Sequence, residues 1–271
     1  MSLPDLPIAL AYIATGLAAG FIGGFLGVGG GILYVPVLDF AFRRFGIADQ
    51  MAFHMALGTS LATITATSAM SAYTHHGANQ VNWRAVGIMA VGGLVGVTIS
   101  AQAAIGLDPR LLKALFGLLL FGVAYRFFAH APRPADSVER NTVPRLVLVG
   151  LASAFIAGFF GVGGGIVTVP LLCMVAHYPT HRAIGTSSAL IVFNSLVGMI
   201  NYGGSPSAEP VPGAVGFVHI GAWIFLAAAS MLTSRLGALT AHRLDPKPLR
   251  IAFAVFIVIL GVRYVAGYFL S

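Results

Sequence analysis

Charged residues are scarce in this 271-residue chain: 15 Lys and Arg and 8 Asp and Glu make up 8% of the sequence. Soluble globular domains average about 25% charged residues, so an ordinary water-exposed surface is excluded. A single cysteine, Cys173, excludes an intramolecular disulfide framework and a cysteine-rich metal site. Apolar residues dominate instead, at 58% of the chain with a mean hydropathy of +0.90.

Long intervals of the chain contain no Asp, Glu, Lys or Arg. A bilayer core about 30 Å thick requires about 20 apolar residues per helix. The charge-free intervals that reach this length are 6–38, 50–83, 85–107, 146–181, 183–208 and 210–234. The sequence therefore predicts an all-α, polytopic membrane protein. The first interval is interpreted as a retained membrane segment, because no charged n-region or A-x-A-like cleavage site accompanies it.

Basic residues give the chain a formal net charge of +7. They are scattered through short loops instead of clustering on one face. This pattern is typical of the positive-inside rule of membrane topology, so we expect no nucleic-acid partner.

One glycine-rich phrase occurs twice. Residues 21–38 and 155–172 align without a gap and share 13 of 18 positions, with FLGVGGGILYVPVL in the first copy and FFGVGGGIVTVPLL in the second. A Gly-Thr-Ser motif also recurs, at 58–60 and 185–187, each time four residues after a histidine. The conserved order of features predicts two homologous halves, 1–128 and 143–271, joined by a charged linker at 129–142.

Each half contains five apolar segments. We predict them near residues 6–26, 31–42, 55–74, 84–106 and 111–128, and near 145–160, 165–177, 183–201, 216–237 and 248–269. Because this number is odd, the halves are expected to enter the membrane in opposite orientations, as the inverted repeats of many secondary transporters do. Loop charges favour a cytoplasmic linker and periplasmic termini, with nine Lys and Arg on the side of the linker against five on the other.

The second segment of each half has only about a dozen apolar residues, too few for a full span. Interrupted segments at matching positions are the best sequence pointer to a transport site. A glycine break frees backbone N–H groups at the start of the next helix, and these attract anions together with the helix dipole. We predict that Gly29, Gly30, Gly31, Gly163, Gly164 and Gly165 bind the substrate. The alternative is close helix packing through small residues.

The glycine phrase does not fit the phosphate-binding motifs of soluble proteins. A dinucleotide fingerprint would require glycine at position 32, where the chain has isoleucine. A P-loop would require a lysine, and none lies nearby.

Polar side chains accumulate in the third segment of each half. Hydroxyl and amide groups inside a membrane either join helices or line a polar path, and both roles stay open here. The residues that we predict to complete the substrate site are Thr59, Ser60, Thr186, Ser187 and Asn194.

Carboxylates are nearly absent from the predicted membrane segments. Only Asp39 lies near one, at its edge, so the carboxylate relay typical of cation transporters is not evident. Helix N-termini, hydroxyls and amides suit an anion instead. His54 and His181 are candidates for coupling transport to protons, since histidine titrates near neutral pH. The alternative is a role in capping a helix or at the level of the lipid headgroups.

The paired GFxGVGGGxxxVPxL phrases, each followed by a Gly-Thr-Ser helix, resemble the sulfite exporter TauE/SafE family of bacterial membrane permeases. The resemblance covers nearly the whole chain. It implies export of small sulfur-containing or organic anions, such as sulfite, sulfoacetate and related sulfonates, across the inner membrane. It also implies that the short second segments are re-entrant or half-helices.

The predicted mechanism is alternating access between two inverted halves, with the glycine breaks facing each other near the membrane midplane. An anion channel on the same site is the alternative. A membrane-embedded hydrolase is disfavoured, because the histidine six residues before Ser60 or Ser187 lies on another helix face. No catalytic residue, metal or cofactor is predicted, the partners are a small anion and the bilayer, and homo-oligomerisation stays open. A bulky residue in place of Gly30 or Gly164 is expected to abolish transport and leave folding intact.

Overall fold

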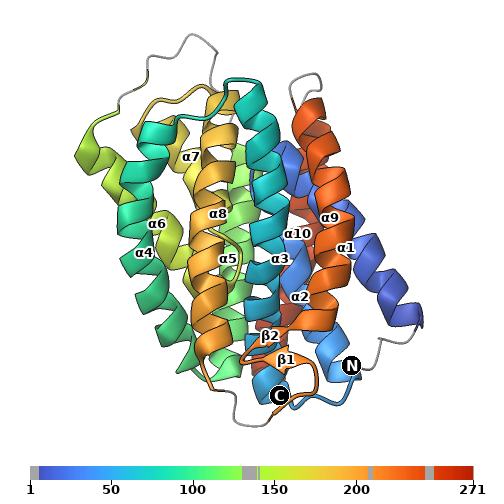
Figure 1. Cartoon of the computed structure of the whole chain (residues 1–271). Helices are drawn as coiled ribbons and strands as arrows, with labels where there is room; N and C mark the ends of the chain where they lie inside the picture. The colour runs from blue at the N-terminus through green and yellow to red at the C-terminus, as the bar shows by residue number, and fades with distance from the viewer. Residues whose placement is uncertain (1–5, 130–138, 140, 207–209, 242–246, 271) are drawn as a thin grey trace.

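A computed structural model of the protein describes residues 6–129, 139, 141–206, 210–241 and 247–270. Within these residues the chain forms ten helices and one short hairpin, which confirms the predicted all-α fold (Figure 1). The first half contains α1 (Leu6–Leu26), α2 (Gly31–Arg44), α3 (Asp49–Gly77), α4 (Trp83–Ile105) and α5 (Pro109–Ala129). The second half contains α6 (Val143–Phe160), α7 (Gly165–Val175), α8 (Thr180–Gly204), α9 (Ile220–Thr240) and α10 (Lys247–Leu270).

The connection before α9 differs from the sequence prediction. A helix was expected over 216–237, but α9 begins later, after β1 (Ala214–Val215) pairs with β2 (Val218–His219). Gly213 and Gly216 have φ values of +81° and +53° here. Glycine adopts such values without strain, so these two residues turn the chain before the helix can start.

Six of the described helices, α1, α4, α6, α8, α9 and α10, are long and apolar enough to cross a membrane. Their outer faces carry large exposed apolar side chains. Val91 on α4, Leu232 on α9 and Phe269 on α10 are 75%, 71% and 78% exposed. Such a surface suits lipid instead of water. The chain is a multi-pass membrane protein.

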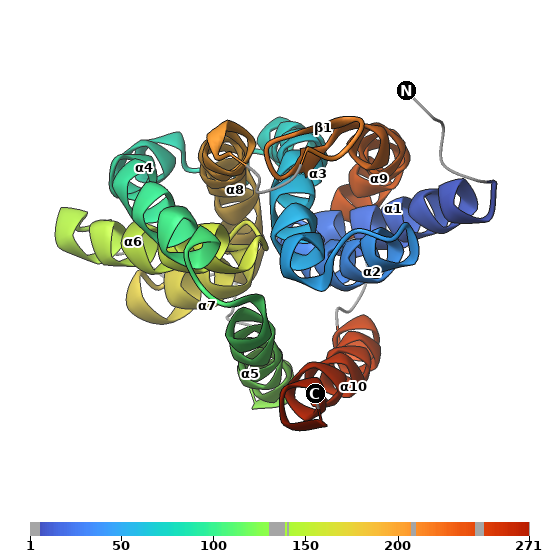
Figure 2. The same ribbon diagram turned by 90° about the horizontal axis from the view of Figure 1, so that it is seen from below.

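The helices form two bundles and an outer pair (Figure 2). The first bundle consists of α1, α2, α3 and α9, and the second consists of α4, α6, α7 and α8. The outer pair, α5 and α10, packs together beside them. Helix α1 packs along α9, and α6 packs along α4. The fourth helix of each sequence half, α4 or α9, therefore lies in the bundle of the other half, and we call α4 and α9 the lent helices. The halves are therefore interleaved.

The two bundles meet at α3 and α8. The hydroxyl oxygens of Ser71 and Ser188 lie 3.1 Å apart, and Thr65 donates to Ser195 over 3.1 Å. Residue numbers therefore fall along α3 as they rise along α8, so the two helices are antiparallel. Both are buried along much of their length, which places their polar side chains inside the protein.

The short helices of the fold are α2 and α7. Their 14 and 11 residues span about 21 Å and about 16 Å at 1.5 Å per residue, less than the ~30 Å of a hydrocarbon core. In Figure 1, α2 runs toward the end that carries the β1–β2 hairpin, and α7 runs toward the opposite end. They are half-helices, as the interrupted second segments predict.

Candidate functional site

Two glycine breaks interrupt the chain at equivalent places. The first break is residues 27–30, between α1 and α2, and the second is residues 161–164, between α6 and α7. Their glycines with positive φ are Gly27 (+67°), Gly29 (+78°), Gly30 (+81°), Gly161 (+66°), Gly163 (+73°) and Gly164 (+81°). Residues with a Cβ atom rarely adopt these values. The backbone conformation that both breaks share therefore requires the duplicated glycines.

The two breaks touch each other inside the molecule. A Cβ atom on Gly31, the first residue of α2, would lie 2.7 Å from the Cα of Val162 in the second break. A Cβ atom on Gly165, the first residue of α7, would lie 2.6 Å from the carbonyl oxygen of Gly27 in the first break. Only glycine permits such an approach. The structure therefore brings the two predicted glycine triplets into one region.

Each break leads into a half-helix whose N-cap is glycine. Gly30 and Gly164 make no side-chain cap. The first helical bonds run from the amides of the third and fourth helix residues to the N-cap carbonyl, at 3.0 and 3.3 Å in α2 and 3.0 Å for both in α7. The amides before them have no partner within their helix, and the helix dipole adds positive potential. Both helix starts therefore favour a negatively charged ligand.

Gly30 and Gly164 leave no room for a side chain. A Cβ atom on Gly30 would lie 2.7 Å from the carbonyl oxygen of Ala19, and one on Gly164 would overlap the carbonyl oxygen of Ser153. The overlap involves the backbone of α1 or α6 instead of a flexible side chain. The prediction that a bulky residue at either position leaves folding intact is therefore wrong.

The threonines of the Gly-Thr-Ser motifs anchor the lent helices. Thr59 on α3 accepts a hydrogen bond from the amide of His219, just before α9, over 2.9 Å. Thr186 on α8 accepts one from the amide of Asn82, just before α4, over 3.1 Å. Both threonines are fully buried. Each therefore holds the helix that its bundle receives from the other half.

The serines of the same motifs bond the glycine breaks. Ser60 donates to the carbonyl oxygen of Gly161 over 2.8 Å, and Ser187 donates to that of Gly27 over 3.1 Å. Each serine thus faces the break of the other half. Of the two roles that the sequence left open, these bonds support the joining of helices. Because each hydroxyl is bonded to a backbone carbonyl, neither is presented to a histidine base as a hydrolase would need.

Behind each break lies a hydroxyl network that the sequence did not reveal. Behind the first, Thr67 Oγ1 lies 3.2 Å from the Tyr34 hydroxyl and 2.7 Å from Ser230 Oγ. Behind the second, Ser153 Oγ lies 2.6 Å from Thr168 Oγ1. Tyr34 and Thr168 stand at the same position of the two glycine phrases, and this equivalence is the signal that could have found them.

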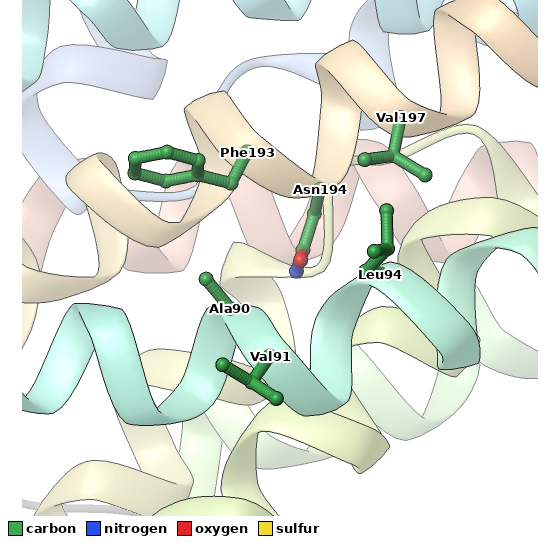
Figure 3. Close-up of a pocket in the computed structure, with 6 residues that line it drawn as sticks. All are labelled: Ala90, Val91, Leu94, Phe193, Asn194 and Val197. Carbon is green, nitrogen blue, oxygen red and sulfur yellow. The ribbon is translucent and has the colours of Figure 1, made fainter.

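Asn194, the predicted amide ligand, is 1% exposed on α8. Its Nδ2 donates to Ser153 Oγ over 3.1 Å, whereas its Oδ1 has no hydrogen-bond partner among the described residues. It borders a groove of about 350 Å³ between α4 and α8 whose other lining residues are Ala90, Val91, Leu94, Phe193 and Val197 (Figure 3). A small anion would find one polar side chain there and otherwise apolar surface, which does not favour a charged ligand.

Ser68 on α3 faces the first break with an unsatisfied hydroxyl. It is 1% exposed, and its Oγ has no hydrogen-bond partner among the residues that the structure describes. This oxygen lies 3.2 Å from the position of a Cβ atom on Gly29. The equivalent Ser195 instead donates to the carbonyl oxygen of Ile191 over 2.6 Å. An unsatisfied buried hydroxyl costs about 1–3 kcal/mol, so Ser68 is available to a ligand.

The duplicated histidines occupy different environments. His54 is 5% exposed on α3, and its ring nitrogens lie 3.1 Å from the carbonyl oxygen of Gln50 and 3.0 Å from that of Ala104. His181 is exposed in the first turn of α8. In the described part of the chain no group of three or more His, Cys, Asp or Glu is arranged to hold a metal ion.

Asp39 is buried in the protein. It lies in the second half of α2 at 5% exposure. Its carboxylate pairs with Arg43, one turn on, at 3.2 Å and with Lys113 of α5 at 3.6 Å. Tyr264 of α10 donates its hydroxyl to the same carboxylate over 3.5 Å. Asp39 therefore fastens α2 to the outer pair, whereas the equivalent position of the second half is Cys173.

Known proteins match this chain along most of its length. The sulfite exporter TauE/SafE family matches residues 12–264. Probable membrane transporter protein MJ0441 of Methanocaldococcus jannaschii is 33% identical over 92% of both chains. A probable membrane transporter protein of Haemophilus influenzae is 28% identical, with 93% of this chain and 96% of the relative covered. Probable membrane transporter protein YunE of Bacillus subtilis is 24% identical with the same coverage. The protein is therefore a membrane transporter, and it belongs to the sulfite exporter TauE/SafE family.

Proposed function

We propose that the protein is a secondary transporter that exports small sulfur-containing or organic anions, such as sulfite, sulfoacetate and related sulfonates. The observation that carries the proposal is the contact between the two glycine breaks. There the N-termini of two half-helices, one from each half, supply amides and positive potential to a single region. A sulfite or sulfonate group offers several oxygen acceptors to such amides.

The ligands in the proposed site are backbone groups with one added hydroxyl. They are the amides of Gly29, Gly30, Gly31, Gly163, Gly164 and Gly165 and the hydroxyl of Ser68. The polar side chains that the sequence predicted as ligands instead make hydrogen bonds to the glycine breaks, to the starts of the lent helices and to Ser153. They are Thr59, Ser60, Thr186, Ser187 and Asn194.

The charges around the site are compatible with an anion. The buried carboxylate of Asp39 lies eight residues beyond Gly31 in α2, which is about 12 Å along the helix. Its charge is offset by the ion pairs with Arg43 and Lys113. The ion pairs therefore reduce the electrostatic repulsion between Asp39 and an anion at the breaks.

Alternating access is proposed to move the two bundles relative to each other. A rigid movement of the sequence halves would separate α1 from α9 and α6 from α4, which are packed pairs. Movement of the first bundle against the second keeps both pairs intact and changes the contact between α3 and α8. The bonds of Ser60 to Gly161 and of Ser187 to Gly27 both cross between the bundles. We propose that they open in turn.

The proposed location is the inner (plasma) membrane, with both termini in the periplasm and the linker at 129–142 in the cytoplasm. The asymmetry of loop charges supports this orientation. Most of the linker, residues 130–138 and 140, lies outside the described residues.

The test is uptake of radiolabelled sulfite and sulfoacetate into proteoliposomes that contain the purified protein, with and without an imposed pH gradient. We expect saturable uptake and counterflow into liposomes preloaded with unlabelled anion. Sensitivity to the gradient would indicate proton coupling and make His54 the first residue to replace. Uptake that neither saturates nor shows counterflow would indicate a channel. Absence of uptake of both anions would contradict the proposed substrate class.

A further inference from the structure

One isoleucine stands at the same position of each central helix. Ile64 on α3 and Ile191 on α8 each follow the threonine of a Gly-Thr-Ser motif by five residues. Both side chains are fully buried. They are therefore equivalent partners from the two halves, and each lies on the helix at which the bundles meet.

Each isoleucine contacts both glycine breaks. A Cβ atom on Gly163 would lie 2.8 Å from Ile191 Cγ2 and 2.9 Å from Ile64 Cγ2. A Cβ atom on Gly29 would lie 3.0 Å from Ile64 Cγ2 and 3.3 Å from Ile191 Cγ2. The two branched side chains therefore fill the space between the breaks, where the anion is proposed to bind.

A bond between the bundles lies on either side of the isoleucines. Ser60 is one turn before Ile64 on α3, and Ser187 is one turn before Ile191 on α8. Because α3 and α8 are antiparallel, the two serines lie toward opposite ends of the molecule. Their bonds to the glycine breaks therefore enclose the apolar pair from both sides.

We propose that Ile64 and Ile191 form a paired hydrophobic gate in the anion path and that their bulk sets the largest anion that passes. This inference rests on the proposed function and extends it. A dehydrated anion gains nothing from two apolar side chains, and a narrow apolar constriction also excludes water. The pair therefore blocks leakage between the two sides of the membrane until the bundles move apart. In this structure the gate is closed, because both isoleucines pack against both breaks.

The test measures passive leak of chloride, nitrate and thiosulfate from proteoliposomes that contain no sulfite. The double variant Ile64→Ala with Ile191→Ala should leak chloride at least about tenfold faster than the wild type, because the shortened side chains let water enter the constriction. Each single variant should leak chloride at a rate between those of the wild type and the double variant. Leu190→Ala is the matched control, since it shortens a fully buried side chain of α8 that packs in another cluster. A folded double variant with wild-type leak would overturn the gate.

A second measurement covers the case in which the double alanine variant fails to fold. Both isoleucines approach the same point at Gly163, so cysteines at 64 and 191 in a Cys173→Ser background can be bridged by a short bifunctional methanethiosulfonate reagent. The bridge, which is held by a disulfide at each end, should stop sulfite uptake, and a reductant should restore it. Undiminished uptake by the cross-linked protein would show that the pair does not have to part.

The two proposals fail differently. If wild-type protein takes up neither sulfite nor sulfoacetate but the double alanine variant leaks chloride, the gate proposal is supported and the proposed substrate class is contradicted. If sulfite uptake by the wild type is saturable while the double variant neither leaks chloride nor admits thiosulfate, the transporter proposal is supported and the gate proposal is contradicted.

Discussion

The two glycine breaks share one backbone conformation but differ in their surroundings. Both have three glycines at matching positive φ values, and both accept a serine bond from the other half. The first break, however, has the unsatisfied hydroxyl of Ser68 beside it, whereas the equivalent Ser195 is bonded. The half-helix after the first break carries the ion-paired Asp39, and the other carries Cys173 at that position.

This comparison separates two kinds of residue. The bonds of the Gly-Thr-Ser motifs, which occur in both halves, hold the interleaved fold together, because each one joins an element of one half to an element of the other. Features that occur once can distinguish the two ends of the path. Under the proposed alternating access, two inverted halves with identical sequences would give two end states of equal energy. A preference for one state would then come from unmatched residues such as Ser68 and Asp39.

The largest effect is expected from alanine in the breaks. Gly46 has a φ of +79° with no atom within 4 Å of a Cβ position, so Gly46→Ala adds only backbone strain, about 1–2 kcal/mol. Gly30→Ala and Gly164→Ala add overlap with backbone, at a further cost of about 1–3 kcal/mol. Thermal unfolding in detergent should show both break variants at lower melting temperatures than Gly46→Ala, with Gly164→Ala the lower of the two because its Cβ atom would come closer to the backbone. Equal melting temperatures for all three would contradict the close packing of the breaks.

The next effect distinguishes α2 from α7. Asp39→Asn leaves Lys113 without its buried partner and should lower the free energy of unfolding by about 3 kcal/mol. Replacing Lys113 by methionine in addition should recover part of the loss, because no unpaired charge then remains. Cys173→Ser, at the equivalent position, should have a smaller effect. A double variant no more stable than Asp39→Asn would argue against the pair.

Much of the fold could be predicted from the sequence. Charge-free intervals and shorter apolar stretches indicate the helices because a charge is costly in lipid, although α9 begins later than expected, and the duplicated glycine phrase locates both half-helices. The exchange of α4 and α9 between bundles could not be predicted. Helices in lipid associate through close packing of small residues, and nothing in α1 shows that it packs on α9 instead of α4.

The partners of single polar groups were also beyond sequence reasoning. Arg43 follows Asp39 by four residues, which is a local signal, but Lys113 comes from another helix. The Gly-Thr-Ser motif was visible, whereas its bonds to Gly161, Gly27 and the starts of α4 and α9 depend on the tertiary structure. A repeated motif thus predicts similar surroundings in both halves, but it does not identify the residues to which the motif is hydrogen-bonded.

A smaller difference is expected between Ser68 and Ser195. Ser195→Ala removes a bonded hydroxyl and should lower stability by about 1 kcal/mol. Ser68→Ala removes a buried hydroxyl that has no partner among the described residues and should raise stability by about 1 kcal/mol, because the cost of that unsatisfied group disappears. Addition of sulfite should raise the melting temperature of Ser195→Ala more than that of Ser68→Ala. Equal stabilisation of both variants by sulfite would remove Ser68 from the proposed ligands.

The smallest expected effect concerns the N-caps of the lent helices. Asn82 Oδ1 accepts a bond from the amide of Ala85, and His219 Nδ1 accepts one from the amide of Ala222, each over 3.1 Å. The two caps are equivalent, but only His219 is a titratable residue. Burial lowers the pKa of His219, which favours the neutral ring that can accept this bond.

The sign of the pH effect follows from this direction. Above the ordinary histidine pKa of about 6.5, His219 is neutral in both states and its cap contributes fully. As the pH falls below that value, the unfolded chain binds the proton first, so the stability from this group is lost. His219→Asn copies the cap at position 82 and should flatten the melting temperature between pH 5 and pH 7, at a cost below about 1 kcal/mol at neutral pH. The same slope in wild type and variant would assign the titration to another group, with His54 the next to replace.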